Sequence, residues 1–393
     1  MKLSSFLRLS SKTTNPQANP SIVYNLYSLP SFDDGRKCEV VHGSEIQSNK
    51  FIVPDKCILF NKLNVRFKRI WRIDNTEPNK IASTEFLPLV VDESIVDFHY
   101  CYYLLRSDRI TDYLTGQNTN TSGSHKRIDP DNFFDIEVSL PPLEDQKRIG
   151  EVLSNLDMKI DINTSLNHYL EAMAKQLYDY WFVQFDYPDA EGKPYKSSSG
   201  KMVWNEKLKR EIPEGWDVVS VGDILDGYPT TKKYETKEYQ PSGLYPIIDQ
   251  GGQYIVGYTN EDSNLLNRLP AVLFGDHSTK VKLLDFPFAR GADGTQILYS
   301  NTDRIQQYYL YHAVLSMQIP NPGYSRHFKY LKGMPIIKPD LDIAQKFDKT
   351  VTPIYKKWTA LIHEINDLSK QRDELLPLLM TGQVSVTPLN NDL

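Results

Sequence analysis

The chain has 393 residues, and its 45 Lys+Arg against 50 Asp+Glu give a formal net charge of −5, which argues against a generally basic nucleic-acid-binding protein. Three cysteines, none in a C-x-x-C pair, exclude a disulfide framework and disfavour a structural zinc site. No run reaches the roughly 18 apolar residues of a membrane-spanning helix, and residues 1–14 lack the apolar core of a signal peptide. We therefore expect a cytoplasmic protein of two or three domains, with no membrane partner.

Residues 1–140 contain short apolar runs separated by Pro, Gly, Asn and Asp. Runs such as Cys57–Phe60 and Phe86–Val91 have the length and the aliphatic or aromatic content of strands. An aromatic-rich stretch, Asp97–Leu114, predicts one helix. The pattern therefore predicts a first globular domain of mixed α/β structure.

A long helix is predicted over residues 141–186. Proline is absent from Leu143 to Phe185, and apolar residues recur at steps of three and four, which is the pattern of a coiled coil. Asn163 and Asn167 interrupt this row: either they lie on an exposed stretch, or they are buried amides that fix the pairing register. The residues expected to pack against a second helix are Leu153, Leu156, Ile160, Leu170 and Leu177.

The second half of the chain has the same plan. Residues 187–212 are polar and predict a connecting loop, 213–338 predict a second mixed α/β domain, and 339–393 predict a second long helix with a carboxy-terminal tail. Arg372 breaks the apolar row of this helix, and its prolines Pro353 and Pro377 predict a kink or a broken turn. Its expected packing residues are Phe347, Val351, Ile354, Trp358, Leu361, Ile365 and Leu368.

An internal repeat is predicted because similar segments occur in the same order in both halves. A repeat of globule and helix predicts an α+β fold, in which two mixed α/β domains are joined by two long antiparallel coiled-coil helices about a pseudo-two-fold axis. Such a protein suits a ligand with two separated sites, and bipartite DNA is the obvious candidate. The matched segments are Cys57–Phe60 with Ala271–Phe274, His99–Leu105 with Gln306–Tyr311, Ser124–Ile128 with Ser325–Phe328, and Ile136–Leu143 with Met334–Leu341.

Four motifs give the chain a family resemblance. They are Leu140–Ile149 (LPPLEDQKRI), Ile212–Trp216 (IPEGW), Val221–Ile224 (VGDI) and Leu378–Gly382 (LLMTG). Together they resemble the specificity subunits of type I restriction-modification systems, over essentially the whole chain. The first globule departs from the family pattern because it opens on residues 1–10 without the Gly-Trp pair of the second.

The resemblance implies a set of partners and roles. Each globule would be a target-recognition domain that reads one half of a bipartite site in double-stranded DNA. The helices would set the half-site spacing and dock two methyltransferase (modification) subunits, and restriction (translocase-nuclease) subunits would join later. This subunit would have no cofactor and no catalytic role, while the complex would use S-adenosylmethionine, ATP and Mg.

The residues themselves also indicate no catalytic, cofactor or metal site. The sequence has no phosphate-binding G-x-x-x-x-G-K-[ST] loop. Asn321–Tyr324 has Gly in place of the second Pro of an N-P-P-Y methyltransferase motif, and His277 beside Asp276 has no nucleophile motif. The alternative to DNA recognition is a non-enzymatic coiled-coil scaffold whose globular heads bind protein partners.

Clusters of basic residues predict which residues would contact DNA, since each globule is close to neutral overall but basic in places. The run from 66 to 72 can equally be the solvated face of a strand. The loops at 124–127 and 325–329 are favoured, because position and chemistry coincide in both repeats. The predicted DNA-binding residues are Arg66, Lys68, Arg69, Arg72, Ser124, His125, Lys126, Arg127, Lys232, Lys233, Ser325, Arg326, His327 and Lys329.

Overall fold

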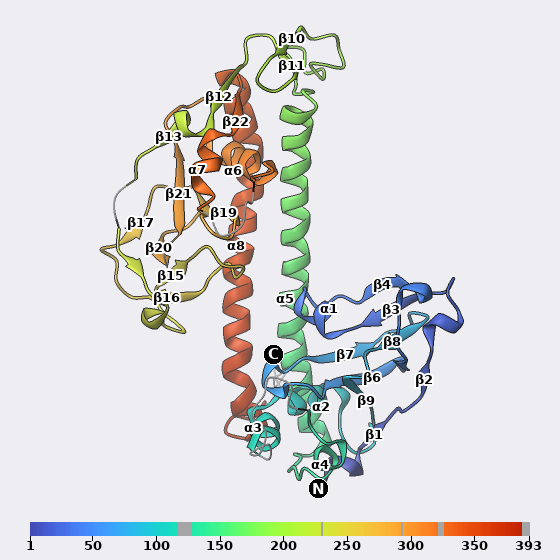
Figure 1. Ribbon diagram of the computed structural model, residues 1–393. Helices are drawn as coiled ribbons and strands as arrows, with labels where there is room; N and C mark the ends of the chain where they lie inside the picture. Colours follow the sequence, from blue (N-terminus) through green and yellow to red (C-terminus); the bar gives the residue numbers. More distant parts are fainter. Residues whose placement is uncertain (117–126, 229–230, 292–293, 321–325, 387–393) are drawn as a thin grey trace, which may run out of the picture. The chain divides into compact units, whose positions relative to one another are not determined.

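The computed structural model describes residues 1–116, 127–228, 231–291, 294–320 and 326–386. Its contacts divide the chain into two compact units (Figure 1). Unit 1 is Met1–Asp161 with Asn366–Leu393, and unit 2 is Ile162–Ile365. Both divisions fall inside long helices, so each unit holds a stretch of α5 (Leu143–Tyr178) and a stretch of α8 (Leu341–Met380). The predicted domain boundaries remain predictions.

Unit 1 is built on two sheets. The antiparallel four-stranded sheet has the order β1-β9-β6-β7, and the five-stranded sheet has the order β2-β5-β8-β3-β4. The strands are β1 (Leu7–Leu9), β2 (Thr13–Thr14), β3 (Val23–Tyr27), β4 (Glu39–His42), β5 (Lys50–Ile52), β6 (Lys56–Asn61), β7 (Ile70–Asp74), β8 (Lys80–Ala82) and β9 (Phe86–Val91). The short helices are α1 (Leu29–Asp33), α2 (Phe98–Arg106), α3 (Asp108–Gly116) and α4 (Pro130–Phe134).

Unit 2 repeats this topology. Its four-stranded sheet has the order β13-β21-β18-β19, and its second sheet has the order β14-β20-β15-β16 with β17 paired to β20. The strands are β12 (Asp217–Ser220), β13 (Leu225–Asp226), β14 (Lys233–Tyr234), β15 (Tyr245–Ile248), β16 (Gly257–Thr259), β17 (Leu265–Leu266), β18 (Ala271–Gly275), β19 (Val281–Leu284), β20 (Phe288–Gly291), β21 (Thr295–Ser300) and β22 (Pro335–Lys338). The short helices are α6 (Gln307–Ser316) and α7 (Phe328–Gly333). The internal repeat and the mixed α/β class are thus confirmed.

The central strand of each four-stranded sheet is buried on both faces, which explains its uninterrupted apolar sequence. In β6, Ile58 and Phe60 face a core that includes α2, whereas Cys57 and Leu59 face a core that includes residues of the second sheet. In β18 the same alternation places Val272 and Phe274 in one core and Ala271 and Leu273 in another.

The polar connection at 187–212 is more ordered than predicted. Instead of a loop alone, it contains β10 (Met202–Asn205), which pairs antiparallel with β11 (Arg210–Pro213). Local polar bonds close this hairpin, because the Asn205 side chain accepts from the backbone N–H groups of Lys207 and Leu208 at 3.0 and 3.1 Å.

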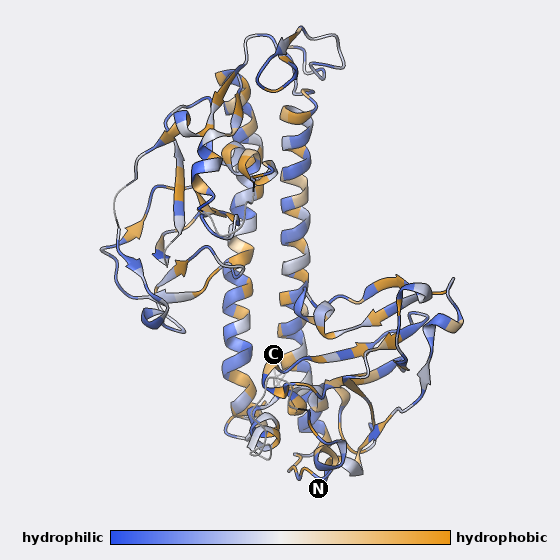
Figure 2. Ribbon diagram, viewed as in Figure 1, coloured by the Kyte–Doolittle hydropathy of each residue, from blue (hydrophilic) through white to orange (hydrophobic). Residues whose placement is uncertain are grey.

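The long helices alternate hydrophobic and hydrophilic residues along their length (Figure 2). Within unit 1, Ile149 and Leu153 share a core with Leu379, and Arg372 bonds to Asp157, so the two stretches run antiparallel. α8 runs unbroken through Pro353 and Pro377, so the expected broken turn does not form. No helix in the described part of the chain has the length and apolar content that a membrane span requires.

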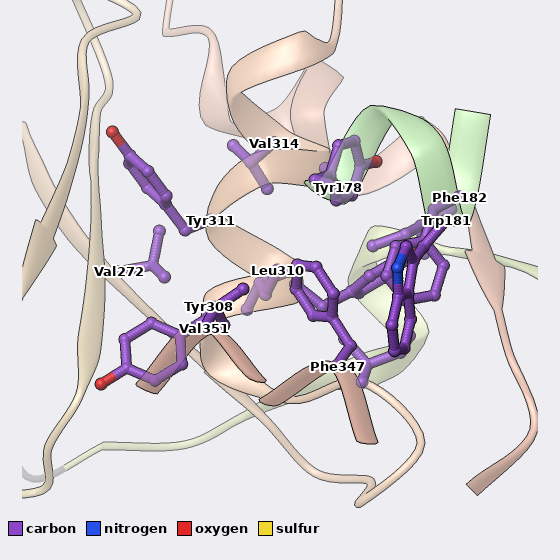
Figure 3. Packing of buried hydrophobic residues seen from close by; sticks show 14 of the residues in the cluster. Tyr178, Trp181, Phe182, Val272, Tyr308, Leu310, Tyr311, Val314, Phe347 and Val351 are labelled. Carbon is purple, nitrogen blue, oxygen red and sulfur yellow. The ribbon is translucent and has the colours of Figure 1, made fainter. Parts of the chain in front are cut away.

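The apolar face of α8 packs partly on the globule and not only on α5. In unit 2, Trp358 contacts Tyr254 edge-on at 5.5 Å, and Phe347 packs against Trp181 and Phe182 (Figure 3). We expected the apolar face of α8 to pack only against the other long helix. Instead, it packs against both that helix and the globular part of unit 2. The predicted packing residues Leu153, Phe347, Val351, Trp358, Leu361 and Leu368 are buried, and Leu156, Ile160, Leu170, Leu177, Ile354 and Ile365 are half-buried.

The two seam asparagines lie on the packed side of α5. Asn163 is 6% exposed, and within the described residues neither its Nδ2 nor the buried Oδ1 of Asn167 has a hydrogen-bond partner. This burial excludes the exposed-stretch interpretation for Asn163. A role in fixing register stays a hypothesis.

Arg372, which breaks the apolar row of α8, belongs to a buried ionic cluster in unit 1. Its Nη1 donates to Asp157 on α5 at 2.8 Å, and the two side chains are only 12% and 13% exposed. The Tyr103 hydroxyl on α2 donates to the same carboxylate at 2.5 Å, and Arg106 lies 3.6 Å from it. Burial alone would raise the pKa of Asp157, but the hydrogen bonds from Tyr103 and Arg372 outweigh it and hold that pKa below its usual range.

In unit 2, the positions equivalent to the Asp157 cluster hold uncharged side chains. Aligning the first residues of α5 and α8, with an offset of 198 residues, pairs Asp157 with Tyr355 and Arg372 with Ala174. Aligning α2 and α6 at their N-cap residues, Asp97 and Gln306, pairs Tyr103 with His312. Tyr355 and His312 are joined by a hydrogen bond of 2.6 Å. A neutral aromatic contact thus replaces the ionic cluster.

Replacing Asp157 with Ala should strongly destabilise unit 1. The change leaves Arg372, Arg106 and the Tyr103 hydroxyl without their shared carboxylate, and removing one member of a buried ion pair costs about 3–5 kcal/mol. Urea denaturation would measure the loss. Glu374→Ala is the matched control, because Glu374 pairs with Lys370 at 3.9 Å on the exposed side of α8 and should cost less than about 1 kcal/mol. Equal losses in both variants would contradict the assigned role of Asp157.

His312 should make the stability of unit 2 depend on pH. Burial lowers its pKa to about 4, with Asp179 opposing and Lys175 adding to the shift. Because the folded state favours the neutral ring, the contribution is fully present above pH 6.5 and is lost as the pH falls toward 4. The loss should reach about 3 kcal/mol. His312→Gln, which keeps an acceptor for Tyr355, should flatten the urea-measured stability between pH 7 and 4.5; an unchanged slope would show that other groups set it.

Candidate nucleic-acid interface

The connection after the central strand of each four-stranded sheet is held by the same pair of backbone hydrogen bonds. In unit 1, the Lys62 N–H donates to the Glu85 carbonyl at 2.7 Å, and the Lys62 carbonyl accepts from Ile128 at 3.0 Å. In unit 2, the Asp276 N–H donates to the Gly294 carbonyl at 2.7 Å, and the Asp276 carbonyl accepts from His327 at 2.8 Å. The two edges are therefore equivalent.

This equivalence places Arg127 and Arg326 at the same point of the two units, each directly before the anchored residue. Arg127 is exposed and makes a bidentate bond to Glu85, with Nε and Nη2 donating at 3.0 and 2.6 Å. Two of its five N–H donors are thus used, and the plane of the guanidinium is fixed.

Arg326 has no carboxylate at that place, because the counterpart of Glu85 is Gly294. The Gly294 backbone has φ +85°, and a Cβ there would lie 2.5 Å from the Gln250 amide, so a side chain is excluded. Arg326 is exposed, and among the described residues the structure shows no ion pair to it. The segment that carries Arg326 is held by Asp276, because its Oδ1 accepts a hydrogen bond from the Phe328 N–H at 2.8 Å.

His327 is a correction to the predicted set. It is 2% exposed, and its Nδ1 lies 2.9 Å from the Asp276 carbonyl oxygen. It occupies the position of the buried Ile128 in unit 1. His327 therefore anchors the loop that carries Arg326, and its side chain does not face solvent.

The basic residues of the run from 66 to 72 in unit 1 have different surroundings. Arg66 is exposed on the 3₁₀ turn Val65–Phe67. Lys68 pairs with Asp108 at 2.5 Å, and Arg69 makes a bidentate bond to Asp33 with both contacts at 2.7 Å. Arg72 is half-buried on β7, where its Nη1 is 3.1 Å from His99 Nδ1 and its guanidinium covers the Tyr102 ring, and its DNA contact stays a prediction.

The remaining predicted residues are distributed as follows. Lys232 is held by Glu238 at 2.9 Å and Glu261 at 3.5 Å, so two carboxylates already neutralise it. Lys233 starts the short strand β14, and Lys329 is exposed on α7 above the Tyr330 ring. Ser124, His125, Lys126 and Ser325 lie outside the described residues.

Sequence reasoning missed the residues that hold these edges in place. Glu85 fixes Arg127 from a position 42 residues earlier, and Asp276 fixes the Arg326 loop from 52 residues before Phe328. Gln250 accepts from the His277 N–H at 2.9 Å and so fixes the turn beside them. A signal existed only for Asp276 and His277, which stand directly after β18 (Ala271–Gly275). Two equivalent units that present an arginine from the same edge define a duplicated recognition protein.

Comparisons with known proteins agree with this class. A family model for the type I restriction modification DNA specificity domain matches residues 2–172. The MjaIX specificity subunit of a type I restriction enzyme from Methanocaldococcus jannaschii is 25% identical over 334 residues, covering 79% of this chain and 74% of that protein. The HindI specificity subunit from Haemophilus influenzae is 29% identical over 150 residues, covering 38% of this chain and 33% of that protein.

A solved structure shares the fold. The S subunit of a type I restriction-modification system from M. genitalium matches with a TM-score of 0.57 at 16% identity, covering 96% of this chain and 95% of that one. Residues 2–172 thus match the DNA specificity domain of these systems, and the likenesses together indicate a specificity subunit of a type I restriction-modification system. The likeness to these proteins supports a DNA sequence-recognition subunit.

Asp276→Ala should loosen the Arg326 loop without unfolding unit 2. The change removes the acceptor of the Phe328 N–H, a partly buried bond to a charged group worth about 1.5–3 kcal/mol. Hydrogen exchange at the Phe328 amide should therefore accelerate by at least about tenfold. Asp303→Ala is a control because, among the residues that the structure describes, the bond of Asp303 is made by its backbone carbonyl, which accepts from Gln306. Unchanged exchange at Phe328 would show that the loop is held by other contacts.

Proposed function

We propose that each unit reads one half of a bipartite double-stranded DNA target through the edge that carries Arg127 or Arg326. The equivalence of these two arginines, fixed by matching backbone bonds in both units, is the observation that carries the proposal. A recognition residue must sit on a rigid frame and still reach solvent. Both arginines meet this requirement, since each is exposed and directly precedes a buried, hydrogen-bonded residue.

The chemistry of these edges suits base reading in a groove. An exposed guanidinium can bind O6 and N7 of guanine with two parallel hydrogen bonds, whereas a lysine more often pairs with phosphate. Arg66 in unit 1 and Lys329 in unit 2 are exposed and could add such backbone contacts. Lys68, Arg69 and Lys232 are already paired with carboxylates, so they support the frame instead.

We propose further that the two half-sites differ in sequence. Glu85 orients Arg127, and that constraint has no counterpart at Arg326, where Gly294 stands in its place. The same backbone position therefore presents two differently restrained guanidinium groups. Differently restrained donors select different base edges, because a bidentate contact requires a defined plane.

The remaining roles are assigned to the long helices and to partner subunits. We propose that α5 and α8 set the half-site spacing and dock two methyltransferase subunits, which restriction (translocase-nuclease) subunits then join. S-adenosylmethionine, ATP and Mg would be used by those partners, for methylation and for cleavage. The resemblance of the Leu140–Ile149 motif at the start of α5 supports this assignment.

Arg326→Ala should relax recognition of one half-site only. Loss of a bidentate contact costs about 1–3 kcal/mol of discrimination at the base concerned. Selection of duplexes from a randomised pool, using the chain together with its methyltransferase subunits, would show which positions of the split motif lose information.

Arg127→Ala is the reciprocal variant for this experiment, since Arg127 is the equivalent residue of the other unit. It should relax the opposite half-site and leave the first intact. Loss of information at both half-sites in either variant, or at neither, would overturn the assignment. Binding of a protein partner without any selected duplex would instead support the scaffold alternative.

A further inference from the structure

Unit 1 contains a cavity of about 910 Å³ whose lining includes Leu140 and Ile149 of the Leu140–Ile149 motif, and the DNA-reading edges proposed above do not use it. It lies between the first turn of α5, the carboxy-terminal end of α2 and the end of α8 with the residues that follow it. Ile149, Leu376, Leu379 and Met380 give it apolar walls. The described residues that line it include no aromatic ring.

The corresponding place in unit 2 is filled by aromatic side chains. With the offset of 198 residues that aligns α5 and α8, Leu379 corresponds to Trp181, Met380 to Phe182, and Ile149 to Phe347. These three rings pack together, with centroids 5.7 Å apart for Trp181–Phe347 and 4.9 Å for Phe182–Phe347 (Figure 3). Unit 1 thus has smaller side chains on the same framework.

Unit 2 also closes this place with a separate segment that carries Trp216. This side chain is 5% exposed, stacks on Tyr187 at 5.1 Å, and lies 5.9 Å from Phe182 and 5.8 Å from Phe185. Gly215 takes φ +85° directly before it, which turns the chain so that the indole points inward. The counterparts of Tyr187 and Phe185 in unit 1 are Ser385 and Gln383, which leave room for such a segment.

We propose that the unit 1 cavity docks a tryptophan-bearing peptide segment of a partner polypeptide, of the Pro-Glu-Gly-Trp type that the chain uses in unit 2. A second copy of this chain is a poor source, because its own Trp216 is already buried in its unit 2. Nucleic acid is also a poor occupant, since aliphatic side chains wall the cavity and three of its basic residues are already paired: Lys68 with Asp108, and Arg106 and Arg372 with Asp157. Arg109, which is exposed at the same cavity, can pair with the glutamate of the segment.

The test uses a fluorescein-labelled peptide of residues 209–220 and the full chain, with fluorescence anisotropy as the readout. The peptide should bind saturably, and the same peptide with Trp216→Ala should bind at least tenfold more weakly. Met380→Phe, which copies Phe182 into the cavity, should weaken binding of the first peptide by at least tenfold. Met173→Phe is the matched control, because Met173 is exposed on α5 and does not line the cavity; it should leave binding unchanged.

Several outcomes would overturn the proposal. They are equal binding of the two peptides, no binding, competition by an unrelated DNA duplex, or self-association of the chain that Met380→Phe abolishes. If Met380→Phe fails to fold, as judged by its thermal unfolding, Thr381→Trp fills the cavity from its rim instead. Because the readout is peptide binding, this proposal can fail while DNA recognition stands, and the reverse also holds.

Within the assembled complex, a photoreactive benzoylphenylalanine at position 380 identifies the occupant. A cross-link to a tryptophan-containing segment of another polypeptide, mapped by mass spectrometry, supports the proposal. A cross-link to residues 209–220 of a second copy, or to DNA, overturns it.

Discussion

Unit 1 depends on a contact between distant parts of the chain. Its amino-terminal globule and the first stretch of α5 share a core with residues from the end of α8, and Arg372 reaches Asp157 across 215 residues of sequence. The buried carboxylate has partners on both α2 and α8, so it ties the globule to both long helices at one point. An ionic contact of this kind tolerates little displacement, because a buried charge without its partner is strongly unfavourable. The position of α8 along α5 in unit 1 is therefore fixed by the Arg372–Asp157 contact as well as by apolar burial.

The two units show how a duplicated backbone can diverge without losing its topology. Tyr103 and Asp157 in unit 1 become His312 and Tyr355 in unit 2, so that an ionic contact becomes a neutral hydrogen bond at the same place. Glu85 becomes Gly294 at the recognition edge. At this edge the backbone bonds are kept while the side chains change. Backbone bonds depend little on residue type, which explains why they outlast the side-chain chemistry of either copy.

The sequence predicted the long helices and the internal repeat, which depend on the spacing of apolar residues and on the order of similar segments. The long helices follow from apolar spacing, and the repeat follows from matched strands such as Cys57–Phe60 and Ala271–Phe274, which the structure places at the centre of equivalent sheets. Even Arg127 and Arg326 were matched, since both stand before a matched segment, Ile136–Leu143 or Met334–Leu341, that leads into a long helix. Local patterns carry this information because each element must bury one face.

What could not be predicted depends on partners far apart in the chain. Arg69 and Arg72 have the same charge, but Asp33 holds one and His99 contacts the other. His327 looked like a DNA contact because basic residues surround it, yet it fills the place of a buried isoleucine. Pro353 was expected to disturb α8, but tertiary packing of Val351 and Tyr355 on either side keeps the helix intact. Local propensity is overridden wherever burial contributes more free energy.

The two exposed arginines are held by separate contacts, so the target of one unit can change without the other. Arg127 is oriented by Glu85, and the Arg326 loop is held by Asp276, in each case through contacts inside one unit. Substitutions at one edge therefore share no partner with substitutions at the other, and effects without shared partners add independently. The buried strands and the Asp157 cluster contribute the stability, while in the function proposed above the exposed arginines read the DNA. One half-site can then be altered by a few edge residues while the second half-site and the fold are preserved.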